Sequence, residues 1–264
     1  MTTATADASG GVAARIKALQ RNPWLGLSLA LLGLVISAIV LWIVISTVTS
    51  SPDVDFSVKD ILEPSKIRSQ ISEHLVLTFW STLLVLIVAI PLGVFLTRER
   101  FVRYEGPVLG VASSGQAIPA YGLLVIFFTW FGRGVVTSIL ALTVFSLLPV
   151  LRNTVVGIQQ VDPAIIEAGR GMGMRRRQEL IKIELPLAVP VIMAGVRTAL
   201  VINVGTAALA VFIGGGGLGE TINSGLKLQR PFATFSGAAI LAVLALFIDW
   251  LAAVIYRVVR PRGL

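Results

Sequence analysis

The most prominent feature of the chain is a series of long stretches in which nearly every residue is apolar. A bilayer core requires about 20 such residues per helix. The stretches are continuously apolar rather than polar at every second position, which disfavours a β-barrel and leaves helices as the way to satisfy the backbone in hydrocarbon. The pattern therefore predicts an all-α integral membrane protein with six transmembrane helices, at Trp24–Val48, His74–Leu96, Pro107–Phe131, Val135–Leu151, Ala188–Ile213 and Phe232–Tyr256.

Composition supports this interpretation and narrows the chemistry. Hydrophobic residues make up 55% of the chain and charged residues 14%, against about 45–50% and about 25% in soluble domains. The sequence contains no cysteine and one histidine, His74. Disulfides, thiolate metal sites and multi-histidine metal sites are therefore excluded, and we expect this chain to bind no metal.

The basic residues predict how the helices are oriented. If six spans alternate in direction, 15 of the 22 basic residues fall on one face, six fall on the other and Arg197 lies within a span. Because cytoplasmic loops are enriched in Lys and Arg, both termini are expected to be cytoplasmic. The net charge of +8 then lies entirely on that face. Topology and contact with the lipid bilayer account for it, so no nucleic-acid partner is expected.

This topology divides the chain into segments. The first helix has an apolar run of 25 residues, longer than the roughly 7–15 of a cleavable signal, and no A-x-A site follows, so we expect it to be retained. The expected segments are a partly disordered cytoplasmic region 1–23, the first helix 24–48, an extracytoplasmic loop 49–73, a core 74–256 with five helices, and a cytoplasmic tail 257–264. Within the core lies a cytoplasmic loop, 152–187, which is long enough to have structure of its own.

Local signals predict two short helices in this loop. Asp162 followed by Pro163 is typical of a helix start, because the Asp can accept from free amides and Pro at the first position loses no hydrogen bond. Gly173 is expected to form the turn that ends the first helix. Good helix formers run from Arg175 to Ile183, and the Leu185–Pro186 pair is expected to break that helix before the fifth span.

The same loop resembles the cytoplasmic motif of binding-protein-dependent ABC importer permeases. That motif has Glu-Ala-Ala, three residues, Gly, nine residues, Ile, one residue and Leu-Pro. The sequence matches it at every position except the second alanine, which is replaced by Gly169. The residues that the resemblance assigns to coupling with an ATPase are Glu167, Ala168, Gly169, Gly173, Ile183, Leu185 and Pro186.

Further runs resemble the osmoprotectant branch of that family, over roughly Glu73 to Val259. They are QAIPAYGLL, LLPVLRNTVVGI, VDPAIIEAGRGMGM and FIGGGGLGETI. The resemblance implies a type I ABC importer permease for glycine betaine, choline or carnitine. It also implies that the chain is not an enzyme and that ATP and Mg bind a separate ATP-binding subunit, present as a dimer. The other implied partners are a second permease copy or paralogue and an extracytoplasmic substrate-binding protein.

Several alternatives stay open at this point. Without the motif spacing, Glu167 would be read as an ordinary solvated helix carboxylate. Within the family, the substrate could be another small solute such as methionine. A secondary transporter is a second class, although no internal repeat is evident. A membrane enzyme is a third class, but the chain has no H-E-x-x-H and no G-x-S-x-G motif.

The stretch from Gly214 to Thr221 mimics nucleotide-binding motifs. It satisfies G-x-G-x-x-G, and it satisfies a P-loop except that Glu220 stands where lysine is required. A carboxylate there would repel phosphate, and the segment falls on the extracytoplasmic side. We therefore expect no ATP site. We interpret the glycines as allowing close backbone approach in a loop at the outer end of the pathway, and a flexible turn is an equal alternative.

Two residues, Arg197 and Asp249, are ionisable and lie well inside spans, where an unpaired charge costs about 2.5–3.5 kcal/mol. Their depths agree within about one helical turn, so we expect them to form an ion pair, either within a subunit or across a dimer. A substrate site is the alternative. Pro119, Tyr121 and Asn203 are weaker candidates for lining the substrate pathway. For Tyr121 and Asn203, a helix-to-helix hydrogen bond is an equal alternative. His74, at the edge of a span, is expected to lie at the interface.

Overall fold

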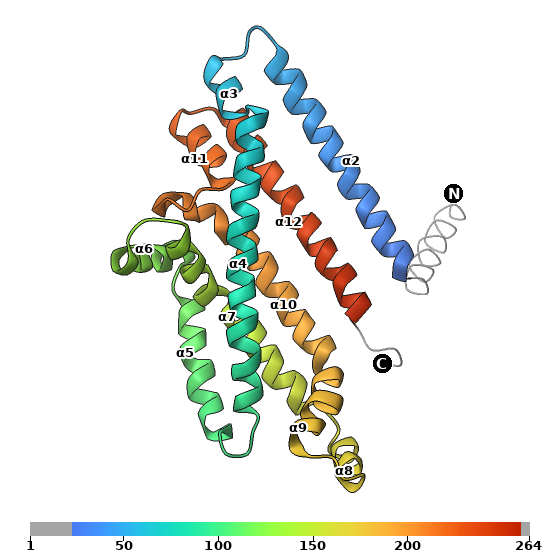
Figure 1. The fold of residues 1–264 in the computed structure, drawn as a ribbon. Coiled ribbons are helices and arrows are strands. Elements are labelled where there is room, and N and C mark those ends of the chain that lie inside the picture. The colour runs from blue at the N-terminus through green and yellow to red at the C-terminus, as the bar shows by residue number, and fades with distance from the viewer. Residues whose placement is uncertain (1–22, 260–264) are drawn as a thin grey trace, which may run out of the picture.

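A computed structural model describes residues 23–259 of the chain, and the helices in this range are joined by short connections (Figure 1). Residues 1–22 and 260–264, which the sequence predicts to be cytoplasmic, lie outside the described residues. The helices are α2 (Pro23–Ser50), α3 (Phe56–Ile61), α4 (Pro64–Leu96), α5 (Glu105–Ala117), α6 (Ala120–Phe131), α7 (Val135–Gln159), α8 (Pro163–Gly171), α9 (Arg176–Glu179), α10 (Leu185–Ala207), α11 (Gly219–Lys227) and α12 (Pro231–Val259), with 3₁₀ turns at Val102–Tyr104 and Ala208–Ile213 and a π-helical turn at Leu180–Glu184.

Five helical segments are long and apolar enough to cross a membrane, and they correspond to five of the six predicted spans. The prediction of an unbroken third span is wrong. That stretch forms α5 and α6, which meet at an angle of 99°. Pro119 provides the physical reason, because it has no N–H and forces the preceding residue out of the helical region. Ile118 accordingly has extended backbone angles, with φ −73° and ψ 131°.

The predicted break at Leu185–Pro186 is also wrong, since the chain stays helical from Arg176 to Ile213. The π-helical turn Leu180–Glu184 precedes Pro186, and the amide of Leu185 donates to the carbonyl of Leu180, five residues back. A π turn is wider than an α turn. It therefore accommodates the proline ring and the missing N–H of Pro186 at the start of α10 without ending the helix.

The core of the bundle lies where α7 packs between α4 and α10. Its buried side chains are aliphatic: Val85, Ala89, Leu96, Val150, Leu151, Val155, Ile158, Ala188, Ile192, Val196 and Ala199. Gly195 on α10 faces α7 so closely that an added Cβ would lie 2.6 Å from the carbonyl oxygen of Pro149. Small residues at such crossings let helix backbones approach, which is how membrane helices gain packing without a hydrophobic driving force.

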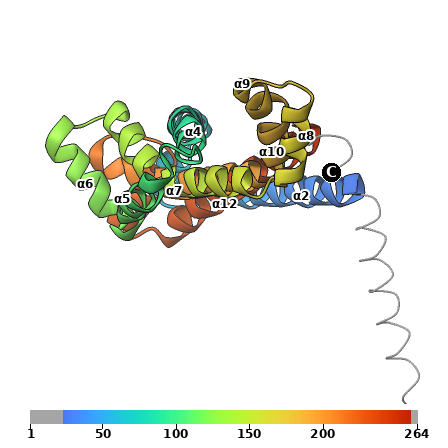
Figure 2. The same cartoon turned by 90° about the horizontal axis from the view of Figure 1, so that it is seen from below.

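Helix α2 is set apart from this bundle and packs mainly against α12 (Figures 1 and 2). The indole Nε1 of Trp250 donates to the carbonyl of Leu27 at 2.9 Å, and the Arg257 guanidinium lies 5.8 Å from the ring centre of Trp24. None of the most apolar part of α2 is buried within the chain. The helix is therefore exposed along most of its length to whatever surrounds the molecule.

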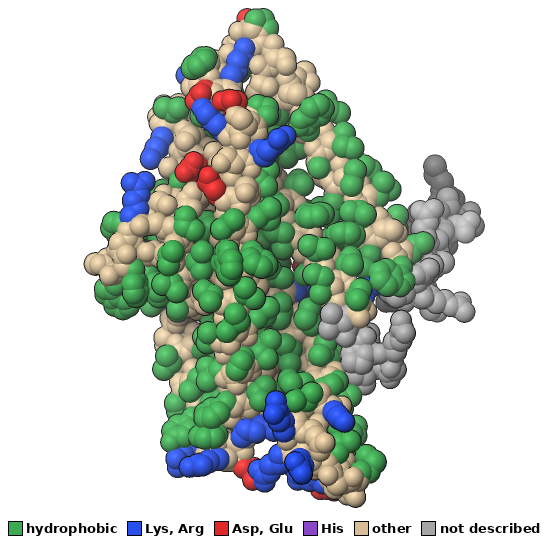
Figure 3. All heavy atoms as spheres, in the orientation of Figure 1, with side chains coloured by type: hydrophobic (Ala, Val, Ile, Leu, Met, Phe, Trp, Pro, Cys, Tyr) green, Lys and Arg blue, Asp and Glu red, His purple; other side chains and the backbone are tan. Residues whose placement is uncertain are grey.

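The two ends of the molecule differ in charge. Lys and Arg side chains gather at the end that carries α8 and α9, whereas acidic and basic side chains are mixed at the end that carries α3 and α11 (Figures 1 and 3). Between the ends, the visible face is mostly hydrophobic (Figure 3). The basic end is the one that the sequence assigns to the cytoplasm, and the orientation of the chain in the membrane stays a prediction.

Candidate functional site

The segment Glu167–Pro186 projects from the basic end of the bundle, where α8 protrudes beyond the long helices (Figure 1). Helix α8 begins as the sequence predicts: the Asp162 carboxylate accepts from the Ala164 amide at 2.9 Å, and Pro163 occupies the first turn. The predicted glycine turn is also confirmed. Gly173 has φ +82°, a conformation that residues with a Cβ rarely adopt. A capped helix and a glycine turn thus define a short, compact element.

The residues of the motif divide into exposed and packed groups. Glu167 and Ala168 are exposed on α8, whereas Gly169 is buried against Ile183 on the π-helical turn. An added Cβ at Gly169 would lie 2.6 Å from Cδ1 of Ile183. An alanine at this position would require the flexible end of Ile183 to shift, so the glycine that departs from the motif lets α8 lie closer to the start of α10.

Two carboxylates that the sequence analysis did not single out fix this element to the bundle. Glu184 pairs with Arg98 at the end of α4, and Glu179 accepts from Nε of Arg170 at 3.2 Å. The side chains of Glu184 and Glu179 are 7% and 4% exposed. Arg98 also donates from Nε to the carbonyl of Val94 at 3.1 Å. The loop 152–187 contains four acids among its basic residues, so the sequence alone does not single out Glu179 and Glu184.

The two ion pairs, Arg98–Glu184 and Arg170–Glu179, have a mechanical consequence. Arg98 lies two residues after α4 and Glu184 immediately precedes α10, so the pair joins the chain at the basic ends of these two helices. Arg170 belongs to α8 and Glu179 to α9, so the second pair joins the two halves of the projecting element. A force applied to the exposed face of α8 would therefore pass to α10 and α4 together.

The three pathway candidates have different surroundings. Pro119 caps α6 at the bend between α5 and α6. Tyr121 is half exposed and meets Phe212 edge to face, with ring centroids 5.3 Å apart. Asn203 is fully buried, and its Nδ2 donates to Oγ1 of Thr82 on α4 at 3.0 Å. The Asn203 contact is the helix-to-helix hydrogen bond that the sequence left open as the alternative.

Arg197 and Asp249 lie in contact, as expected from their depths. Nε and NH2 of Arg197 donate to the two carboxylate oxygens of Asp249 at 2.5 and 2.6 Å. This paired, fork-like geometry is the strongest form of ion pair. The Arg197 side chain is nevertheless 52% exposed within the isolated chain. Because exposed charge at membrane depth is expensive, this face is expected to meet water or protein rather than lipid.

The expectation for His74 is wrong. The side chain is fully buried, and Nε2 lies 2.9 Å from the carbonyl oxygen of Val204. It is buried because the glycine-rich loop covers it: an added Cβ at Gly217 would lie 3.1 Å from Nδ1 of His74. Among the described residues, Nδ1 has no hydrogen-bond partner. A single histidine at the edge of an apolar run could not be assigned to this contact without knowing where the loop lies.

The loop 214–219 allows close approach, as the sequence predicts. Gly214, Gly216 and Gly217 have positive φ angles, and the Gly217 amide donates to the Glu73 carboxylate at 2.9 Å. Burial, and secondly the charge of Glu73, raise the pKa of the Glu220 carboxyl. Glu73 and Glu220 therefore place two carboxylates beside this loop, and their negative charge would repel a phosphate group.

Comparisons with known proteins bear on what this site does. A family model described as "Binding-protein-dependent transport system inner membrane component" matches residues 89–261. A similar curated protein is the "Glycine betaine/carnitine/choline transport system permease protein OpuCB" of Bacillus subtilis, which is 43% identical over 192 residues, or 73% of this chain and 88% of that protein. The "Osmoprotectant import permease protein OsmW" of Salmonella typhimurium is 37% identical over 197 residues, or 73% of this chain and 91% of that protein.

A solved structure of similar fold belongs to the inward-facing MetNI methionine ABC transporter. It has a TM-score of 0.67 at 24% identity, and the match covers 75% of this chain and 99% of that chain. At this level of identity the likeness is one of fold.

Proposed function

Since the chain belongs to the family of binding-protein-dependent transport system inner membrane components, we propose that it is the permease subunit of an ATP-driven importer of osmoprotectants such as glycine betaine, choline or carnitine. The observation that carries the substrate class is the 43% identity to a permease named for these three compounds, across nearly three quarters of the chain. The likeness to the methionine transporter is of fold alone and favours no second substrate.

In this proposal the exposed face of α8, with Glu167 and Ala168, docks on an ATP-binding subunit. Its support is the geometry of the projecting element, which is exposed on one side and clamped to α4 and α10 on the other. ATP and Mg bind that subunit, as a dimer, and this chain carries no cofactor. When the ATP-binding subunits close on ATP, they can shift the permease between conformations only if they bind those conformations differently. The Arg98–Glu184 pair would pass the resulting displacement of α8 to both α4 and α10.

A second permease copy or paralogue completes the pathway. The half-exposed Arg197 supports this part of the proposal, because charged side chains inside membranes face the interior of a bundle or a water-filled cavity. A substrate-binding protein delivers the solute at the opposite end, near α3 and α11. Both termini are then cytoplasmic, on the same side as the arginine-rich end.

The test is uptake in proteoliposomes that contain the permease, its ATP-binding subunit and its binding protein. Uptake of glycine betaine, choline or carnitine should require ATP. Glu167→Ala and Gly173→Asp should insert normally and lose most uptake, because the first alters the docking face and the second strains a φ of +82°. Glu99→Ala, at an exposed carboxylate outside the motif, and Gly171→Ala, at an unobstructed glycine, are the matched controls.

Three outcomes would contradict the proposal. Uptake without any ATP-hydrolysing partner would indicate a secondary transporter. ATP-dependent uptake of methionine but none of the three osmoprotectants would indicate the other substrate. Wild-type uptake by both motif variants would remove α8 from the coupling site.

A further inference from the structure

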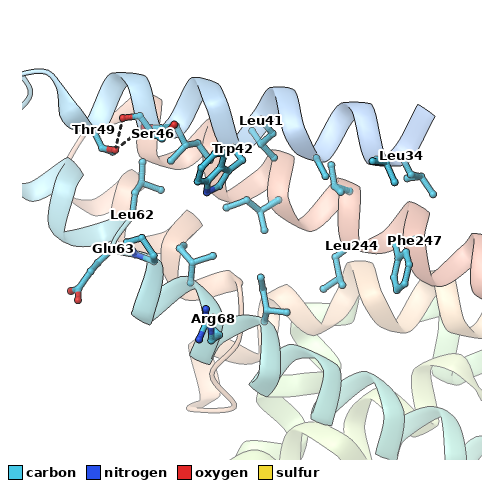
Figure 4. Close-up of a pocket in the computed structure, with 18 of the residues that line it drawn as sticks. Leu34, Leu41, Trp42, Ser46, Thr49, Leu62, Glu63, Arg68, Leu244 and Phe247 are labelled. Atoms are coloured by element: carbon cyan, nitrogen blue, oxygen red, sulfur yellow. Dashed lines mark hydrogen bonds between the residues drawn. The ribbon is translucent and has the colours of Figure 1, made fainter. Parts of the chain in front are cut away.

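A crevice of about 880 Å³ lies between α2, the middle of α12 and the start of α4. Side chains of α2 and of the middle of α12 line the crevice along its length, and the start of α4 lines it near α3 (Figure 4). Hydrophobic side chains cover most of both walls, and the hollow is visible between α2 and the bundle in Figure 3. Helix α2 lies outside the residues 89–261 that match the family, so the family fold does not account for this crevice.

The part of the crevice nearest α3 is lined by polar side chains and by two basic ones. Lys59 and Arg68 line it and form no ion pair within residues 23–259. The neighbouring acids already have partners: Lys66 pairs with Asp60 at 2.6 Å and with Glu63 at 3.7 Å, and Asp55 pairs with Arg230. Glu63 also lines the crevice, but its carboxylate points away from it (Figure 4). The chemistry of the site is therefore cationic at one end and apolar along the rest.

The side chains on the α12 wall argue against a protein helix as the occupant. Membrane helices pack on one another through small residues. Helix α12 has alanines at positions 238, 239, 242 and 245, but the residues it presents to the crevice are Ile240, Val243, Leu244 and Phe247. Large, branched and aromatic side chains suit flexible hydrocarbon better than a second backbone.

From this geometry we propose that the crevice binds an anionic phospholipid, with its phosphate at Lys59 and Arg68 and an acyl chain between α2 and α12. The acyl chain is already in hydrocarbon in the bilayer, so the apolar walls select shape and supply little net free energy. Preference for this lipid therefore comes from the two cations, each of which contributes about 1 kcal/mol near an anionic lipid headgroup, or about fivefold in affinity.

The test measures lipid retained by the full-length purified protein. The protein is placed in nanodiscs of phosphatidylcholine with a minority of phosphatidylglycerol, extracted under mild conditions, and analysed by native mass spectrometry. Wild-type protein should retain phosphatidylglycerol in preference to phosphatidylcholine. Lys59→Gln/Arg68→Gln should weaken that preference about 30-fold, whereas Lys227→Gln, at an exposed lysine of the same end outside the crevice, should leave it unchanged.

A second pair of variants tests whether the apolar side chains of the crevice hold an acyl chain. Ala38→Trp places a large ring in the crevice and should abolish retention, and Ala30→Trp, on α2 but outside the crevice, should not. Both variants leave the lysine and arginine in place, so they separate loss of the acyl site from loss of charge. Each variant is compared with wild type by its melting temperature, which distinguishes lost lipid from a misfolded chain.

Two results would overturn the proposal. One is equal retention of the two lipids by wild type, or retention unaffected by both the double charge variant and Ala38→Trp. The other is occupancy of the crevice by a second copy of this chain. Because the chain has no cysteine, Ala38→Cys introduces a single thiol, and efficient cross-linking of Ala38→Cys into a dimer without bound phosphatidylglycerol would identify the crevice as a protein interface.

Discussion

At the scale of single residues, the burial of a carboxylate decides how much its ion pair matters for stability. Glu179 and Glu184 are almost fully buried and each meets an arginine, whereas Glu99 meets Arg176 at 3.7 Å with both side chains 80% exposed. Exposed pairs contribute about 0–1 kcal/mol, because water screens them and their side chains lose entropy. Breaking a buried pair costs more, since the remaining charge stays buried without compensation.

Glu184→Gln and Arg98→Gln are each expected to lower the free energy of unfolding by about 1–3 kcal/mol, less than for a fully buried pair because Arg98 is 34% exposed. The double variant should lose less than the sum of the two, by about 0.5–3 kcal/mol. Chemical unfolding in detergent provides the measurement. Arg176→Gln is the exposed control and should have no measurable effect. Strict additivity would contradict a direct interaction between Arg98 and Glu184.

Glu220 gives a prediction with a defined pH dependence. Its pKa is raised by burial and by Glu73, so the folded state holds this proton more strongly than the unfolded state does. Ionisation therefore weakens the fold as pH rises through the raised pKa. Glu220→Gln should melt slightly above wild type at pH 7, by only about one or two degrees because the carboxyl is partly and not fully buried. At about pH 3 the two proteins should melt at the same temperature. An equal or lower melting temperature at pH 7 would contradict this.

At the scale of elements, helix crossings depend on small residues at specific positions. Gly195 and Gly205 both lie on α10, but only Gly195 faces another backbone: its added Cβ would lie 2.6 Å from the carbonyl oxygen of Pro149 and 2.7 Å from Cβ of Asn153. No atom lies within 4 Å of the equivalent position at Gly205. The two glycines therefore have opposite consequences when a methyl group is added.

Gly195→Ala should destabilise the protein by about 1–3 kcal/mol, since a backbone carbonyl cannot move aside as a side chain can. Gly205→Ala should be neutral or stabilising by up to about 1 kcal/mol, because alanine is the better helix former. Melting temperatures in the same detergent compare the two variants. If Gly195→Ala matched Gly205→Ala, the close packing of α7 against α10 would not hold in solution.

At the scale of the whole molecule, charge is arranged with respect to the membrane. Basic side chains gather at the end with α8, and the middle of the visible face is apolar (Figure 3). Arg197 and Asp249 lie in two apolar helical segments and pair with each other. An arginine and an aspartate that neutralise each other allow both to remain at this depth. The half-exposed Arg197 then marks the face of the molecule that is least compatible with lipid.

Arg197→Met and Asp249→Leu should each reduce the amount of protein recovered in the membrane, because each leaves one charge unpaired at a cost of about 2.5–3.5 kcal/mol. The double variant removes both charges and should restore recovery. Quantitative immunoblotting of membrane fractions, with uptake measured in parallel, checks this. If the double variant were recovered no better than either single variant, the pair would not be what stabilises these charges.

Much of this protein follows from its sequence, because membranes impose strong local rules. A run of about 20 apolar residues must be helical wherever it crosses, so the spans of α2, α4, α7, α10 and α12 were predictable. The Asp162 cap and the Gly173 turn depend on neighbouring residues only, and so were predictable as well. The motif from Glu167 to Pro186 is a fixed spacing within one loop, which a sequence displays directly.

Only the tertiary structure decided the features that depend on what lies opposite a residue. Pro119 and Pro186 are both prolines in apolar runs, yet one accompanies a 99° bend and the other follows a π turn that keeps the helix continuous. Neighbouring helices must satisfy the freed backbone groups, and the sequence does not say where they lie. Three features involve segments far apart in the chain: the burial of His74, the pairing of Arg98 with Glu184, and the crevice beside α2. Their energies depend on three-dimensional distance, which local patterns of polarity leave undetermined.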